Sequence, residues 1–76
     1  MIDKSAIKEH MEVVGADGIH VGAVDRVEGD SIKLTQNDPD AHGQYHFIPL
    51  DWVDTVGLTV RLTKTWEETH AGWTTR

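Results

Sequence analysis

The fold class of this chain is decided by the stretch Leu58-Thr59-Val60-Arg61-Leu62-Thr63. Its apolar residues alternate strictly with polar ones, which is the pattern of a β-strand that buries one face. The same alternation returns at residues 11–13 and 32–35, and glycine-containing breaks separate the pieces at intervals of roughly ten residues. This spacing predicts an all-β domain, a small barrel or sandwich, with Leu58, Val60 and Leu62 facing its interior.

Three positions are expected to shape the remaining strands. Residues 19–27 begin with alternation and then break parity, so we interpret Gly22 as a bulge or sharp coil that lets one long strand bend. Asp17 and Gly18 have the composition of a tight hairpin turn, and we expect Gly18 and Gly22 at positive φ or at a close backbone approach. Pro49 lacks an N–H group, so the strand over residues 45–50 must end there or lie at an edge.

The end of the chain follows a helical pattern instead. Residues 65–68, Thr-Trp-Glu-Glu, form a capping-box signature, and Trp66, His70 and Trp73 recur at positions i, i+4 and i+7. We therefore divide the chain into a β domain at residues 1–64 and a short helical tail at residues 65–76. The tail helix, over residues 65–73, is expected to cover an apolar opening of the barrel.

Charge and composition narrow the possible functions. The 76 residues include 13 acidic and 7 basic side chains, for a formal charge of -6, and no cysteine, so disulfides and thiolate sites are excluded. No lysine or arginine lies between Lys33 and Arg61, so we expect no direct nucleic-acid binding, which needs clustered cations. Apolar runs are too short for a membrane helix or a signal peptide, so we expect a cytoplasmic protein without membrane contact.

Three motifs resemble a known family. They are Val13-Val14-Gly15-Ala16-Asp17-Gly18, Val21-Gly22-Ala23-Val24-Asp25 and Phe47-Ile48-Pro49-Leu50-Asp51-Trp52-Val53. Over residues 5–64 the chain is similar to the PRC-barrel superfamily, and more closely to a stand-alone bacterial branch known only as a domain of unknown function. This resemblance implies a small, highly bent six-stranded barrel that acts as a protein-interaction module. It supplies no catalytic residue.

A candidate metal site lies in the polar loop over residues 36–44, called here the 36–44 loop. Asp38, Asp40 and His42, with His46 just beyond, offer the oxygen and nitrogen ligands that divalent ions accept. A spacing of four brings two histidines to one face only in a helix, and the Asp-Pro and His-Gly pairs in this loop break helices. If a strand begins at Tyr45, His46 projects from a sheet while His42 stays in the loop. We therefore interpret these four as solvated residues of the loop and its border, and we predict no metal and no cofactor.

No group of residues in the sequence predicts catalysis. Asp51 and Asp54 are three apart beside Trp52, and a turn cap plus a surface charge explains them as well as a pair of catalytic carboxylates does. Ser5 and Ser31 lie in no Gly-x-Ser-x-Gly elbow, and the glycines are too dispersed for a phosphate-binding loop. We predict that the protein is not an enzyme.

Three tryptophans in so short a chain are the strongest functional signal, because Trp is costly to expose and is frequent at binding hot spots. The interface candidates are Trp52, Trp66, His70 and Trp73, although Trp52 could instead plug one end of the barrel and the others could hold the tail to it. The predicted function is a non-catalytic adaptor that binds an unidentified protein or a second copy, as a homodimer. Two alternatives stay open: a protein that binds a small ligand or divalent metal, and, by fold analogy with a ribosome maturation factor, a factor in ribosome assembly or RNA processing.

Overall fold

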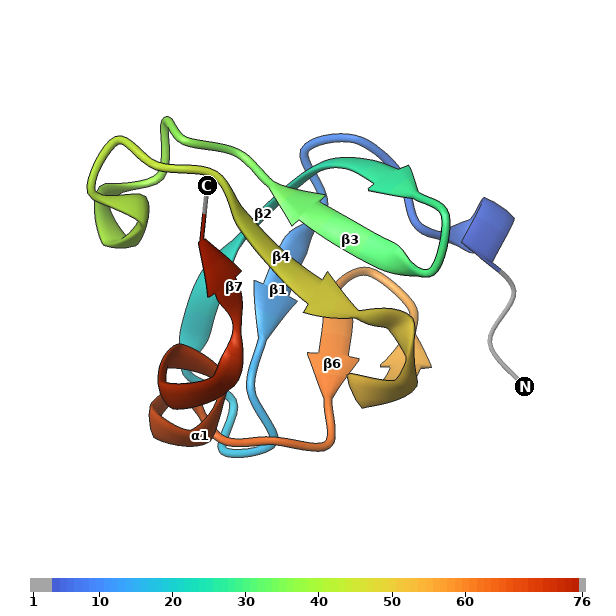
Figure 1. Cartoon of the computed structure of the whole chain (residues 1–76). Coiled ribbons are helices and arrows are strands. Elements are labelled where there is room, and N and C mark those ends of the chain that lie inside the picture. Colours follow the sequence, from blue (N-terminus) through green and yellow to red (C-terminus); the bar gives the residue numbers. More distant parts are fainter. Residues whose placement is uncertain (1–3, 76) are drawn as a thin grey trace.

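The computed structural model describes residues 4–75 and consists mainly of β-strands (Figure 1). In chain order the elements are η1 (Lys4–Ala6), β1 (Glu12–Val14), β2 (His20–Glu28), β3 (Ser31–Leu34), η2 (Pro39–Ala41), β4 (His46–Pro49), η3 (Leu50–Trp52), β5 (Val53–Val56), β6 (Val60–Leu62), α1 (Trp66–Gly72) and β7 (Thr74–Thr75), where η marks a single turn of 3₁₀ helix. The predicted all-β fold with a short C-terminal helix is confirmed.

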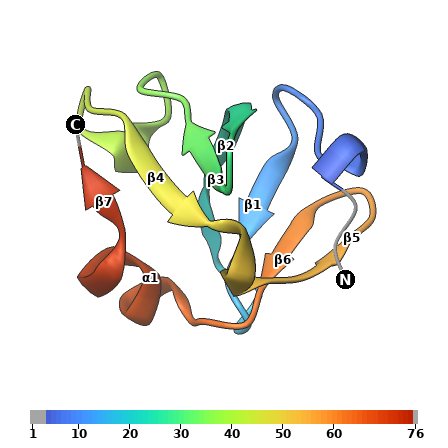
Figure 2. The ribbon, with the colours of Figure 1, turned by 45° about the vertical axis from the view of Figure 1, so that its right-hand side comes forward.

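The strands form one open sheet in the order β5-β6-β1-β2-β3-β4-β7. Neighbouring strands run antiparallel, except for the parallel pair β1 and β6. The edge strands β5 and β7 lie at opposite sides of the fold (Figure 2). The predicted six-stranded barrel is therefore wrong. A barrel needs a hydrogen-bond register that continues around the whole sheet, and in the described residues no ladder joins β5 to β7.

Both sheet edges have features that oppose pairing with another chain. The register of β5 against β6 shifts between Val53 and Thr55, which leaves the exposed residue Asp54 outside regular pairing. The other edge, β7, has only two residues, Thr74 and Thr75. Short strands, bulges and charged side chains protect sheet edges against edge-to-edge association. The edges of this sheet are therefore poor templates for a second copy.

The long strand β2 joins the two halves of the sheet. Residues 20–23 pair with β1, and residues 24–28 pair with β3. The register against β1 shifts between Val13 and Val14, beside Gly22. Gly22 itself does not have positive φ, and a Cβ placed on it would lie 3.2 Å from the Leu34 Cδ1 atom. The prediction that Gly22 has positive φ or a close backbone contact is therefore wrong. The missing side chain of Gly22 instead leaves room for the Leu34 side chain on the neighbouring strand β3.

The tight turns are formed where the sequence places them. Gly18 has a φ of +79°, and its N–H group donates to the Gly15 carbonyl at 2.9 Å. This turn connects β1 to β2. Pro49 is the last residue of β4, where its missing N–H group does not interrupt a ladder.

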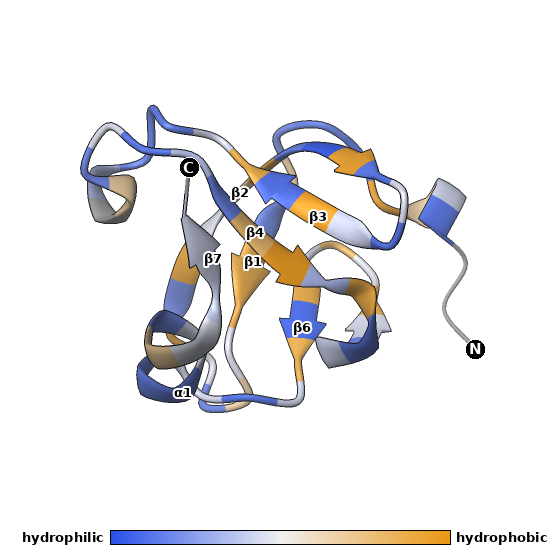
Figure 3. Ribbon diagram, viewed as in Figure 1, coloured by the Kyte–Doolittle hydropathy of each residue, from blue (hydrophilic) through white to orange (hydrophobic). Residues whose placement is uncertain are grey.

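The core lies where the strands face one another, and the apolar residues concentrate there (Figure 3). Its buried members are Ile7, Val13, Val21, Val24, Ile32, Leu34, Ile48, Val53, Val60 and Leu62. The prediction that Leu58 is buried with them is wrong, because its exposed fraction is 99%. The Gly57 N–H donates to the Thr59 carbonyl at 3.0 Å, so Leu58 occupies the tip of the hairpin and β6 starts two residues later.

Candidate functional site

The helix α1 is fixed at its first turn by a capping box. The Glu68 N–H donates to the Thr65 Oγ1 atom at 3.2 Å, and the Thr65 N–H donates to the Glu68 Oε1 atom at 2.9 Å. The backbone and side-chain hydrogen bonds to Thr65 hold the pKa of Glu68 below its ordinary value. The predicted capping box is therefore confirmed, and it satisfies two N–H groups that a helix start would otherwise leave without partners.

The turn between β1 and β2 anchors this helix to the sheet. The Trp66 N–H donates to the Asp17 Oδ2 atom at 3.3 Å, and the Ala16 N–H donates to the Lys64 carbonyl at 2.8 Å. A Cβ on Gly15 would lie 2.9 Å from the Trp66 backbone nitrogen, so only glycine permits this approach. The tail therefore packs against its own chain.

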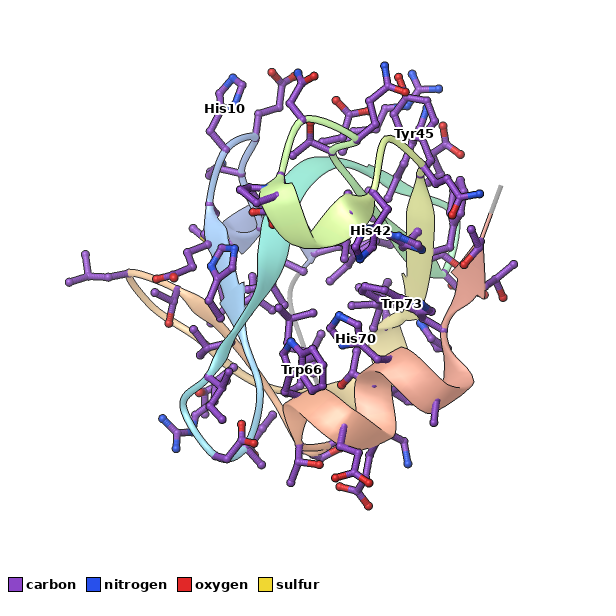
Figure 4. The ribbon with its side chains drawn as sticks, turned by 90° about the vertical axis from the view of Figure 1, so that its left-hand side faces the viewer. His10, His42, Tyr45, Trp66, His70 and Trp73 are labelled. Carbon is purple, nitrogen blue, oxygen red and sulfur yellow. The ribbon has the colours of Figure 1, made fainter. Side chains whose placement is uncertain are left out.

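Four aromatic rings lie in a row between α1 and the sheet, and we call this row the aromatic column; its two end pairs stack, and the central pair, His70 and Trp73, is tilted by 41°. The Trp66 and His70 ring centroids are 4.0 Å apart, those of His70 and Trp73 are 4.1 Å apart, and those of Trp73 and His46 are 3.8 Å apart. Trp66, His70 and Trp73 project from α1 and its C-terminal end toward the 36–44 loop (Figure 4). The helical spacing seen in the sequence produces three members of the column, and His46 joins them from β4.

His46 forms the buried end of the column. Its Nε2 atom lies 3.0 Å from the Ala41 carbonyl, and its Nδ1 atom lies 2.9 Å from the Thr75 Oγ1 atom. The carbonyl oxygen can only accept, so Nε2–H is the donor there. Both ring nitrogens therefore have partners within the chain, and neither is left for a metal ion.

The outer end of the column reaches solvent. Trp66 is 36% exposed, and His70 and Trp73 are partly buried. The His70 Nδ1 atom lies 2.9 Å from the Trp66 carbonyl, which fixes the ring within the stack. The column thus presents a partly exposed aromatic surface whose rings contact one another.

Trp52 lies apart from the column. It packs against the core, and a Cβ placed on Gly72 would lie 3.0 Å from its Cη2 atom. The Lys64 ammonium lies 5.1 Å from the centre of its ring. Of the four interface candidates, the structure thus brings together Trp66, His70 and Trp73, and it places Trp52 beside Gly72, the last residue of α1.

The residues of the candidate metal site do not converge. His42 is exposed and has a φ of +53°, His46 has both nitrogens occupied, and Asp38 binds His20. The side chain of Asp40 lies outside the described part of the structure. Among the described residues, no group of three His, Cys, Asp or Glu side chains could hold a metal ion.

A cluster of Glu12, His20 and Asp38 was not predicted. The His20 Nδ1 atom lies 2.8 Å from the Glu12 Oε2 atom, and its Nε2 atom lies 2.6 Å from the Asp38 Oδ2 atom. Partial burial lowers the pKa of His20, but hydrogen bonds to Glu12 and Asp38 and their negative charges outweigh it, so the pKa is raised. The predicted hairpin across residues 17–18 could have indicated the first contact. Nothing in the sequence indicated the second.

One family matches most of the chain. Residues 7–70 fit the family described as "Uncharacterized protein conserved in bacteria (DUF2171)". No curated protein matches the chain. The family match supports the predicted bacterial domain of unknown function and carries no link to the PRC-barrel superfamily. It also extends into α1, as far as residue 70, beyond the region of the sequence resemblance. No helix within the described residues is long and apolar enough to cross a membrane.

Proposed function

The chain belongs to the bacterial family DUF2171, and from this premise we propose that it is a non-catalytic protein-interaction module. Its contact surface is the exposed side of the aromatic column, centred on Trp66. The observation that carries this proposal is the row of contacting rings Trp66–His70–Trp73–His46, which is open to solvent at one end.

Rigidity favours binding because ordering a flexible side chain costs free energy when a complex forms. The column avoids part of that cost, because hydrogen bonds hold the His70 and His46 rings. Trp73 lies between these two rings, and Trp66 packs on the outer face of His70. Tryptophan is enriched at hot spots for this combination of large contact area and limited freedom.

The charge around the column indicates the kind of partner. Asp17 and Glu67 are exposed at the start of α1, next to Trp66, and the whole chain carries a formal charge of -6. Complementary charge speeds association and suppresses wrong partners. We therefore expect the partner protein to present an apolar pocket with a basic rim.

The test compares proteins captured from a bacterial lysate by wild type, Trp66→Ala and the matched control Leu58→Ala. Leu58 is also an exposed apolar residue, but it lies at the β5–β6 hairpin tip. A partner recovered by wild type and Leu58→Ala, and lost with Trp66→Ala, supports the proposal when all three have equal circular dichroism spectra. Equal recovery by all three, or a turnover reaction that depends on column residues, overturns it.

The alternatives from the sequence have less support from the geometry. A metal ion at His42 and His46 would have to displace the Ala41 carbonyl or the Thr75 hydroxyl from His46. Calorimetry with divalent ions, repeated on the His42→Ala plus His46→Ala variant, tests it directly. A PRC-barrel relationship, and with it a role in ribosome assembly or RNA processing, stays a prediction from the sequence motifs.

A homodimer also stays a prediction. Within the single chain the tail already has contacts, because the Trp66 N–H donates to Asp17 and Trp73 stacks on His46. The protected sheet edges add no driving force for pairing. A molecular weight measured by light scattering in solution decides between monomer and dimer.

A further inference from the structure

We propose that Glu12, His20 and Asp38 form a proton-dependent clamp, here the His20 clamp, that fastens the 36–44 loop to β2 and loosens when the ring loses a proton. The loop lies opposite α1, so the clamp controls one border of the aromatic column (Figure 4). The clamp itself does not depend on the proposed binding function.

The argument begins with the number of protons on the ring. An ionised carboxylate can only accept a hydrogen bond, and a neutral imidazole has one N–H group. His20 has a carboxylate oxygen at hydrogen-bond distance from each nitrogen, at 2.8 Å and 2.6 Å. Both contacts are satisfied together only by the imidazolium form, which donates in both directions.

The Glu12 and Asp38 side chains differ in how freely they can move away from His20. The Glu12 side chain is 48% exposed and can turn into solvent, whereas the Asp38 side chain is 9% exposed and is held within the 36–44 loop. When His20 loses a proton, the tautomer with Nε2–H keeps the Asp38 contact and Glu12 is released. The remaining bond is weaker, because the ring no longer carries the positive charge that attracts the Asp38 carboxylate.

The loop has a second attachment that limits the response. The His46 Nε2–H donates to the Ala41 carbonyl at 3.0 Å and stays in place when His20 is neutral. Loss of the proton therefore loosens the loop without releasing it. Weakening one charged hydrogen bond in a partly exposed site corresponds to an increase of about five-fold in the population of open loop.

No other charged group competes for His20 in the described part of the chain. The remaining charged or titratable residues with described side chains, on elements packed against β2 and on β2 itself, are Lys33 on β3, Glu67, Glu68 and His70 on α1, and Asp25, Arg26 and Glu28 on β2. The side chain of Asp40, on η2, lies outside the described structure. Lys33 pairs with Asp25 at 3.7 Å, and Arg26 pairs with Glu28. The side chains whose charges act on His20 are Glu12 and Asp38.

The first measurement follows the ring protons of His20 by NMR across the pH range in the full chain. We expect His20 to titrate above the ordinary histidine pKa of about 6.5. Asp38→Asn keeps the size of the side chain and removes its charge, so it should shift the His20 titration to lower pH. A His20 that titrates at or below the ordinary histidine pKa, or that is unaffected by Asp38→Asn, overturns the clamp.

The second measurement reports the loop itself. The Ala41 N–H donates to the Asp38 carbonyl at 2.9 Å, so its hydrogen exchange, corrected for the intrinsic pH dependence, follows opening of the loop. We expect the protection of the Ala41 amide against exchange to fall about five-fold from the acid side to the alkaline side of the His20 titration. In His20→Gln the same protection should be independent of pH. The Val24 amide, bonded to the Met11 carbonyl, serves as the global reference. Equal changes at Ala41 and Val24, or the same pH dependence in His20→Gln, refute a local clamp.

Discussion

Replacing Gly15 with alanine tests how the tail is held to the sheet. The added Cβ would lie 2.6 Å from the Asp17 Oδ1 atom, 2.9 Å from the Trp66 nitrogen and 3.1 Å from the Lys64 carbonyl oxygen. Two of these atoms belong to the backbone that leads into α1, so relief requires the start of the helix to move. Asp17 must also turn, although it binds the Trp66 N–H through one oxygen and the Ile19 N–H through the other.

The expected cost follows from these contacts. Overpacking against backbone costs about 1 to 3 kcal/mol, and each weakened exposed hydrogen bond adds about 0.5 kcal/mol. Gly15→Ala should therefore lose about 2 to 3 kcal/mol of unfolding free energy, a large part of the stability of a domain of this size. The corresponding fall in Tm is on the order of 10 to 20 °C.

The assay is thermal or urea unfolding followed by circular dichroism, with Gly57→Ala as the matched control. Gly57 has no atom within 4 Å of an added Cβ and does not have positive φ. An alanine there should be neutral or should stabilise by about 0.5 kcal/mol. If Gly15→Ala proves as stable as Gly57→Ala, the tail does not depend on this close approach and the reasoning is refuted.

Four smaller predictions concern single residues. Gly18→Ala should destabilise by about 1 kcal/mol through its φ of +79° alone, since nothing lies within 4 Å of the added Cβ; Gly18→Asn should recover part of this loss in the same urea titration. Thr69→Val should stabilise by about 1 kcal/mol, because the Thr69 hydroxyl is fully buried and has no hydrogen-bond partner among the described residues; a lower urea midpoint would contradict this. Thr65→Ala should lose about 1 kcal/mol with the capping box, and Thr74→Ala, at an exposed position, should not. The pKa of His20 is raised in the folded state, so its contribution to stability is complete below the pKa of about 6.5 in the unfolded chain and is lost as pH rises through the folded-state pKa. His20→Gln should flatten this part of the curve of unfolding free energy against pH.

The sequence alone determined the local structure of this protein. Alternation identified the buried residues Val60 and Leu62, and the capping box placed the start of α1. The helical spacing also indicated that Trp66, His70 and Trp73 share a face. These features depend on residues a few positions apart, and their geometry is fixed by strand and helix periods.

Only the tertiary structure decided how the elements meet. Alternation continues through Leu58, but the hairpin turn at Gly57 exposes it, because burial depends on where the strand begins. The open sheet, the stacking of His46 on Trp73 and the contact of Asp38 with His20 join residues that are far apart in sequence. Such contacts depend on strand register and on the path of the 36–44 loop, and a one-residue change in register turns every side chain of a strand to the other face. Local patterns therefore determine which segments are strands or helix, and long-range packing determines which side chains form a site.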